Sequence, residues 1–180
     1  MELRHKEIPL EFLRRLPDGI KIVKRLGQEF MVVEQVYGPH GESLISDAVQ
    51  IHNEPSIRLG VRIGDQQGLI FVDAFWGGHA KLYSFLPQSV VANAEVDAFV
   101  PESAASLMVE RSCDVEGCTC RRAIMLALPD GDSRVYVCAR LGCPGHAIEI
   151  ADLPEEVSQQ ISSINFFGAG SLDEDWVDVF

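Results

Sequence analysis

The sequence lacks any apolar run near the roughly 20 residues that a membrane-spanning helix requires. Its first residues, MELRHKEIPLEFLRRL, alternate charged and apolar side chains and contain no uninterrupted apolar region of the kind found in a secretory signal. These two absences exclude a membrane span and give no indication of export. We therefore expect a soluble, cytoplasmic protein that has no membrane partner.

Basic residues are scarce. The chain has 15 Lys and Arg against 27 Asp and Glu, a formal net charge of −12, and neither Lys nor Arg follows Arg140. Such a field repels phosphate backbones and anionic lipids, so general nucleic-acid binding is not expected. Four arginines leave a local nucleic-acid contact open: Arg121, Arg122, Arg134 and Arg140. Four nearby acids match them in number and favour a solvated, charge-paired hairpin: Asp114, Glu116, Asp130 and Asp132. A protein is the expected partner.

No catalytic motif is present: the sequence has no phosphate-binding loop, no dinucleotide glycine signature and no G-x-S-x-G elbow. Most of the histidines stand singly, without an H-x-H or H-E-x-x-H grouping; these are His5, His40, His52 and His79. Each is more often a surface or turn residue than a ligand. We expect a non-enzymatic protein, and an enzyme with an unrecognised site in the β portion stays open.

The composition is that of a folded chain, with 180 residues, 47% apolar and 23% charged. Pro9 predicts a short helix that ends near Pro17, and strands are predicted at 30–37, 56–63, 69–75 and 80–85. Two further strands, near 89–99 and 106–110, and a helix from about 152 to 164 complete the prediction. The fold class is α+β, mainly β: an antiparallel β-meander scaffold with a C-terminal zinc-ribbon-like hairpin and two short helices.

Three segments are expected: a β-rich scaffold with the N-terminal helix (1–110), a zinc-ribbon-like segment (111–150), and a helix with an acidic aromatic tail (151–180). In the middle segment, RRAIMLAL, the turn PDGD and SRVYVC predict a hairpin. A two-residue turn at Asp130-Gly131 would pair residue 123 with 138 and residue 118 with 143. The tail, 165–180, is expected to dock its aromatic side chains on its own domain, with a partner-binding motif as the alternative.

Five cysteines, an odd number, lie between 113 and 143 and suit a metal better than a disulfide framework. They form Cys113-x4-Cys118-x-Cys120 and Cys138-x4-Cys143, and the second group continues to His146. Each half contains C-x3-G-C, as CDVEGC and CARLGC. Zinc needs four ligands at tetrahedral corners, which two short loops can supply when a hairpin joins them.

Six candidates compete for four ligand positions. Cys118, Cys120, Cys138 and Cys143 are the expected zinc ligands, with Cys113 and His146 in reserve. Three alternatives stay open: free buried thiols without a metal, an iron–sulfur cluster, and a redox-responsive or metal-handling protein that uses the surplus thiols.

Residues 113–146 resemble a zinc ribbon, and the run Y-x-C-x4-C with a nearby His is similar to the second knuckle of phage late-gene-activator zinc fingers. The segment departs from that pattern in having C-x-C and C-x4-C where C-x2-C is expected. The resemblance implies a ribbon-type metal site and does not imply DNA binding. Together these features predict a structural zinc site in a protein-interaction or accessory module.

Overall fold

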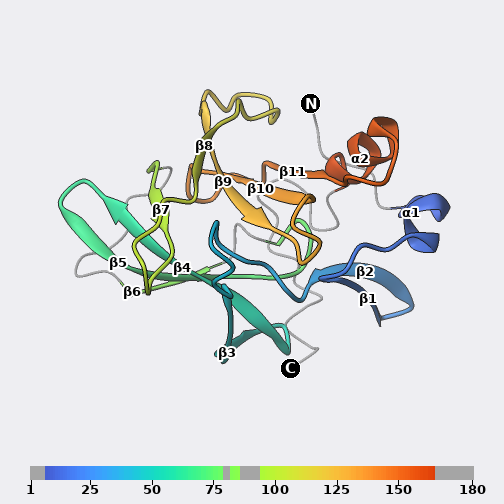
Figure 1. Cartoon of the computed structure of the whole chain (residues 1–180), viewed down its shortest axis with the longest axis horizontal. Helices are drawn as coiled ribbons and strands as arrows, with labels where there is room; N and C mark the ends of the chain where they lie inside the picture. The colour runs from blue at the N-terminus through green and yellow to red at the C-terminus, as the bar shows by residue number, and fades with distance from the viewer. Residues whose placement is uncertain (1–6, 79–81, 86–93, 165–180) are drawn as a thin grey trace.

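A computed structural model of the chain describes residues 7–78, 82–85 and 94–164 (Figure 1). The described residues form two short helices and several antiparallel sheets, as the sequence predicts. The helices are α1 (Leu10–Arg14) and α2 (Glu155–Ser162). The strands are β1 (Ile20–Arg25), β2 (Gln28–Val33), β3 (Ile45–Ile51), β4 (Glu54–Ile63), β5 (Gln66–Val72), β6 (Leu82–Phe85), β7 (Asp97–Phe99), β8 (Met108–Glu110), β9 (Arg122–Ala127), β10 (Arg134–Cys138) and β11 (His146–Glu149).

The predicted meander is present as the antiparallel sheet β3-β4-β5-β6, in which β7 also pairs with β4. Strand β4 has the clearest alternation of apolar residues. Ile57, Leu59 and Val61 are buried, whereas Arg62, near the end of the strand, is exposed. Alternating apolar residues place one face of a strand on the core, which is why this strand is the best defined in the sequence. Gly60 is required by packing, because a Cβ there would lie 2.3 Å from the Phe99 ring.

The predicted hairpin is formed by β9 and β10, which lie in the second sheet, β11-β10-β9-β8. Its register pairs Ala123 with Cys138, as expected. The turn is longer than the predicted two residues: Leu128 N–H donates to Ser133 O at 3.0 Å, and Gly131 N–H donates to Leu128 O at 3.0 Å. The register survives because the turn is lengthened equally on both strands. Asp130 Oδ1 accepts the N–H groups of residues 132 and 133 and holds this turn closed.

Strands β1, β3 and β11 have no counterpart in the predicted elements. Strands β1 and β2 form a separate two-stranded sheet, β3 pairs with the start of β4, and β11 pairs with β10. In β3 only Ile51 is buried, and β11 contains only four residues, so neither has an apolar alternation long enough to indicate a strand. The predicted strand at 89–99 lies partly, and the tail at 165–180 entirely, outside the described residues.

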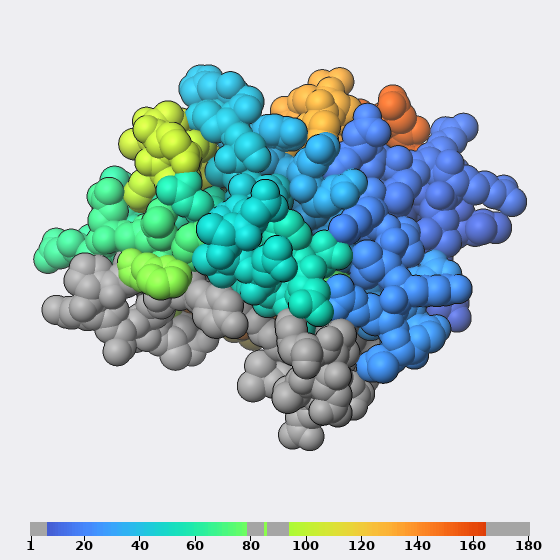
Figure 2. All heavy atoms as spheres, turned by 90° about the horizontal axis from the view of Figure 1, so that it is seen from below, coloured from blue at the N-terminus to red at the C-terminus, as the bar shows by residue number. Residues whose placement is uncertain are grey.

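One hydrophobic core joins these sheets. Its buried members run from Phe12 in α1 to Ile164 after α2, with Leu59 from the meander and Leu126 and Ile148 from the second sheet. Seen from below, residues of the first half of the chain cover most of the described surface, and the β9–β10 hairpin and α2 appear only at its upper rim (Figure 2). No helix in the described residues is long and apolar enough to cross a membrane.

Candidate metal centre

Two loops of the second sheet carry the cysteines, and the first loop runs from Cys113 to Cys120. Cys113 N–H donates to Cys120 O at 3.0 Å and closes the loop at its base. Within it, Cys118 N–H donates to Val115 O at 3.0 Å, and Gly117 has a φ of 85°. That left-handed conformation favours glycine, and it turns the backbone so that Cys118 faces back toward Cys113.

The second loop, from Cys138 to Gly145, repeats this geometry at the same spacing. Cys138 N–H donates to Gly145 O at 3.0 Å, Cys143 N–H donates to Arg140 O at 3.1 Å, and Gly142 has a φ of 84°. Cys138 is therefore the counterpart of Cys113, and Cys143 is the counterpart of Cys118. The position that corresponds to Cys120 in the first loop is Gly145 in the second.

The sulfur atoms of the two loops meet in one cluster. Among the described residues, Cys113, Cys118, Cys138 and Cys143 have Sγ atoms that all lie within 4.8 Å of one another. Cys113 Sγ is 3.7 Å from Cys143 Sγ, and Cys118 Sγ is 3.8 Å from Cys138 Sγ, so each close pair joins the two loops. Four sulfurs bound tetrahedrally to one ion at about 2.3 Å are about 3.8 Å apart. The spacing fits a single metal ion.

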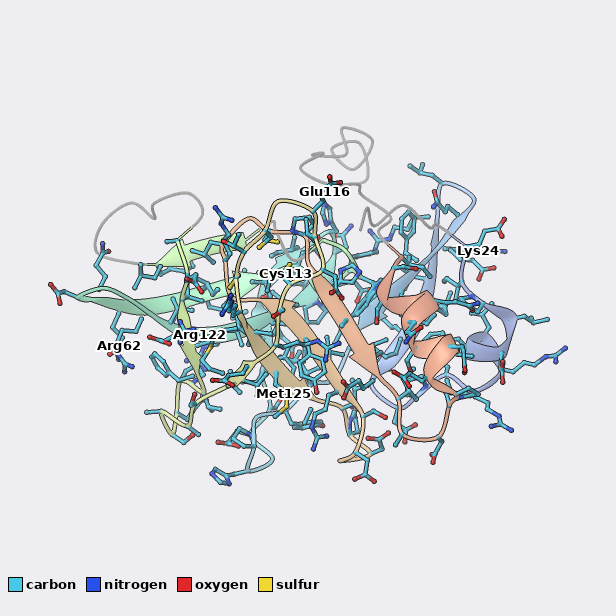
Figure 3. The ribbon with its side chains drawn as sticks, turned by 90° about the horizontal axis from the view of Figure 1, so that it is seen from above. Lys24, Arg62, Cys113, Glu116, Arg122 and Met125 are labelled. Carbon is cyan, nitrogen blue, oxygen red and sulfur yellow. The ribbon has the colours of Figure 1, made fainter. Side chains whose placement is uncertain are left out.

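The cluster is partly shielded from solvent. Cys143 is buried and the other three members are half-buried. In the view from above, Cys113 lies beside other sulfur atoms near the end of the β9–β10 hairpin, whereas Glu116 at the outer part of the first loop points away from them (Figure 3). Gly145 packs so closely that a Cβ there would lie 2.5 Å from Cys113 Sγ. A glycine at this position leaves room for the cluster.

Two of the six candidate ligands lie outside the cluster. Cys120 Sγ donates to Glu95 Oε1 at 3.0 Å and is buried, so the structure brings Cys113 to the other three preferred ligands in its place. His146 begins β11, where its Nε2 donates to Ile164 O at 2.6 Å and its ring lies 4.2 Å from the Trp76 ring. These contacts join β11 to the segment after α2 and to the segment that follows β5.

Neighbouring thiols change one another's acidity. Hydrogen bonds from Cys138 and its neighbours lower the pKa of Cys143 to about 5. The same hydrogen bond raises the pKa of Cys138, and burial raises the pKa of Cys113 to about 12. The cluster thus stabilises one thiolate and resists further ionisation, because like charges would gather in a half-buried site. A bound cation is what allows all four sulfurs to become thiolates.

A second polar pair lies in the β portion. His52, in the turn between β3 and β4, has Nδ1 2.7 Å from Asp73 Oδ2, and Asp73 Oδ1 accepts the Phe75 N–H at 3.0 Å. The pair is inside the protein, with 5% of His52 and 1% of Asp73 exposed. His52 also packs edge-on against the Phe75 ring at 5.8 Å. This arrangement fixes the turn to the end of β5, a structural role that the isolated histidine in the sequence does not indicate.

Comparisons with models of protein families, with curated proteins and with solved structures give no match. The geometry of the cysteine cluster is therefore the feature of the molecule that bears on function.

Proposed function

We propose that this chain binds one zinc ion through Cys113, Cys118, Cys138 and Cys143. The observation that carries the proposal is the set of four Sγ atoms within 4.8 Å of one another, supplied equally by two loops of the same backbone geometry. Thiolates are soft ligands that suit zinc in a tetrahedral arrangement. An iron–sulfur cluster is a poorer fit, since its several irons and sulfides need a larger space between the cysteines.

The role we propose for the ion is structural. Four protein thiolates complete the tetrahedral shell and leave no open position for water or substrate. The ion would tie the first loop, which precedes β9, to the second loop, which joins β10 to β11. Cys120 and His146, which a metal-exchange mechanism would use as surplus ligands, are hydrogen-bonded to Glu95 and Ile164 instead. These contacts favour structural zinc over the redox-responsive or metal-handling alternative.

The wider function that we propose is that of a non-enzymatic interaction or accessory module with a protein partner. A complete metal shell gives the ion no catalytic position, and the net charge of −12 opposes binding to phosphate backbones. The buried His52–Asp73 pair is used in fixing a turn, so it does not support the enzyme alternative. The two cysteine loops are the part of the chain best suited to control such an interaction, because their shape would depend on the bound zinc.

Elemental analysis of protein purified without added metal tests the proposal. We expect about one zinc per chain and no stoichiometric iron, because one set of four thiolates holds one ion. Visible absorbance with bound iron would support an iron site instead. A well-folded preparation that contains neither metal would contradict the proposal, and the cysteines would then be free thiols.

A further inference from the structure

The other end of the β9–β10 hairpin forms a pocket that has no part in the metal site. Its volume is about 330 Å³, and it lies between the hairpin turn, strand β8 and the loop that follows Tyr37. Tyr37 pairs with Ala127 through two backbone hydrogen bonds of 2.8 and 2.9 Å. Strand β8 pairs with residues 122–124 of β9, and Met125 N–H donates to Leu107 O at 2.8 Å just before β8 begins. The pocket opens where these two partners of β9 separate. Pockets that bind small molecules have volumes of about 300 to 1,000 Å³.

Both rims of this pocket are fixed by hydrogen bonds. On one side, Gly38 N–H donates to Glu42 O at 2.8 Å, and Glu42 Oε2 accepts the Ser103 hydroxyl at 2.8 Å. On the other side, Asp130 Oδ2 accepts the Ser133 hydroxyl at 2.6 Å and holds the hairpin turn. A rim that is already ordered loses little entropy when a ligand binds. The pocket is therefore preformed.

Most of the lining is apolar and adaptable. Met108 and Met125 contribute thioether side chains, and Leu107 and Leu128 contribute buried aliphatic ones. Methionine sulfur contacts aromatic rings favourably, and an unbranched methionine side chain adjusts to irregular shapes. Met125 can adjust in this way, whereas Met108 is held in place because its Sδ accepts the Ala98 N–H at 3.2 Å. Figure 3 shows Met125 well away from Cys113, so the pocket and the cysteine cluster occupy different parts of the hairpin. This lining suits the apolar body of a ligand.

One cation stands at the pocket. Arg134 faces Glu149 across the β10–β11 pair, but Glu149 accepts hydrogen bonds from Arg111 at 3.0 Å and from the Tyr136 hydroxyl at 3.1 Å. Arg134 Nη1 instead donates to Gly131 O at 2.6 Å and Ser133 O at 3.0 Å. Within the described residues, no carboxylate oxygen forms an ion pair with this guanidinium. The remaining N–H groups of the Arg134 guanidinium can therefore donate hydrogen bonds to an anion.

We propose that this pocket binds a small carboxylic acid with an apolar body, its carboxylate paired with Arg134 and its body against Met108 and Met125. A planar guanidinium matches a carboxylate with two parallel hydrogen bonds. The volume of about 330 Å³ lies at the lower end of the range for pockets that bind small molecules, which suits a ligand of the size of a single-ring acid. The site is independent of the bound zinc.

Titration with 3-phenylpropionate, followed by the methyl signals of ¹³C-labelled methionine in the full-length, metal-loaded protein, tests this proposal. We expect saturable shifts of Met108 and Met125 and none of Met31, which is 0% exposed in the core and serves as the internal control. The uncharged 3-phenylpropanamide has the same shape and should bind about tenfold more weakly, because a charged hydrogen bond is lost. Arg134→Gln should make acid and amide bind equally.

Three results would overturn the proposal: no shift at millimolar acid, equal binding of acid and amide to the unsubstituted protein, or shifts of Met31 as large as those of the pocket residues. The comparison of acid with amide requires no substitution, so it remains decisive if Arg134→Gln fails to fold. Loss of zinc without loss of acid binding would separate this site from the metal centre.

Discussion

Replacing Cys113 with serine should weaken zinc binding about a hundredfold or more, whereas replacing Cys120 with serine should leave the affinity for zinc almost unchanged. Cys113 Sγ is 3.7 Å from Cys143 Sγ inside the cluster, and Cys120 Sγ is 3.0 Å from Glu95 Oε1 outside it. Four ligands together supply about 10 to 16 kcal/mol of apparent binding free energy, so the loss of one should weaken binding about a hundredfold or more.

Competition with a chromophoric zinc chelator measures this difference. Cys120→Ser is a matched control, because it lies in the same loop and its hydroxyl can still donate to Glu95. If Cys120→Ser weakened zinc binding and Cys113→Ser did not, the ligands would be the four expected from the sequence, and the two loops would have to rearrange around the ion.

The second large effect is expected from zinc removal. A strong chelator should lower the hydrogen-exchange protection factors of the two cysteine loops, 111–121 and 139–145, about a hundredfold or more. One backbone hydrogen bond closes the base of each loop, and the second loop is also held by Val96 N–H to Ala139 O and Leu141 N–H to Ala94 O, both at 2.9 Å. In the second loop, protection should therefore fall most at 142–145. Strands β4 and β5 should keep their protection because Leu59 and Ile70 lie in the core. Strands β9 and β10 should lose only part of theirs, since Leu126 and Val135 share that core.

Mass spectrometry of exchanged peptides, with and without chelator, provides the measurement. Adding zinc back should restore protection, which controls for damage by the chelator. Equal loss of protection along the whole chain would mean that the metal supports one cooperative domain. Unchanged protection in both loops would show that the cysteines are not a structural metal site.

Much of the fold could be predicted from residue patterns. The alternation in β4 places Leu59 and Val61 on the core, and the turn residues around Asp130 set a register that pairs Ala123 with Cys138. Strand β3 could not be predicted, because only Ile51 in it is buried and the strand is held by pairing with β4 rather than by an apolar face. The three-segment division remains a prediction, and the core contains residues of all three segments.

The metal site was predictable in type and less so in its members. The repeated C-x3-G-C pattern reflects two loops of equal geometry, in which each glycine takes a positive φ before the second cysteine. When the two halves of the repeat are aligned, Cys113 corresponds to Cys138, and Cys120 corresponds to Gly145. Cys120 lies outside the cluster, although the sequence favours it over Cys113 as a ligand. The hydrogen bond that turns its sulfur to Glu95 depends on a long-range contact, which no local pattern reveals.

X-ray absorption at the zinc edge of the purified protein is the most direct test of a single zinc held by four cysteines. We predict a shell of four sulfur atoms at about 2.3 Å, without nitrogen or oxygen ligands. The spectrum should be the same for Cys120→Ser and should lose a sulfur in any Cys113→Ser protein that retains zinc. A shell that contains an imidazole nitrogen or a water oxygen in the unsubstituted protein would contradict the account, because it would make His146 a ligand or give the ion an open position.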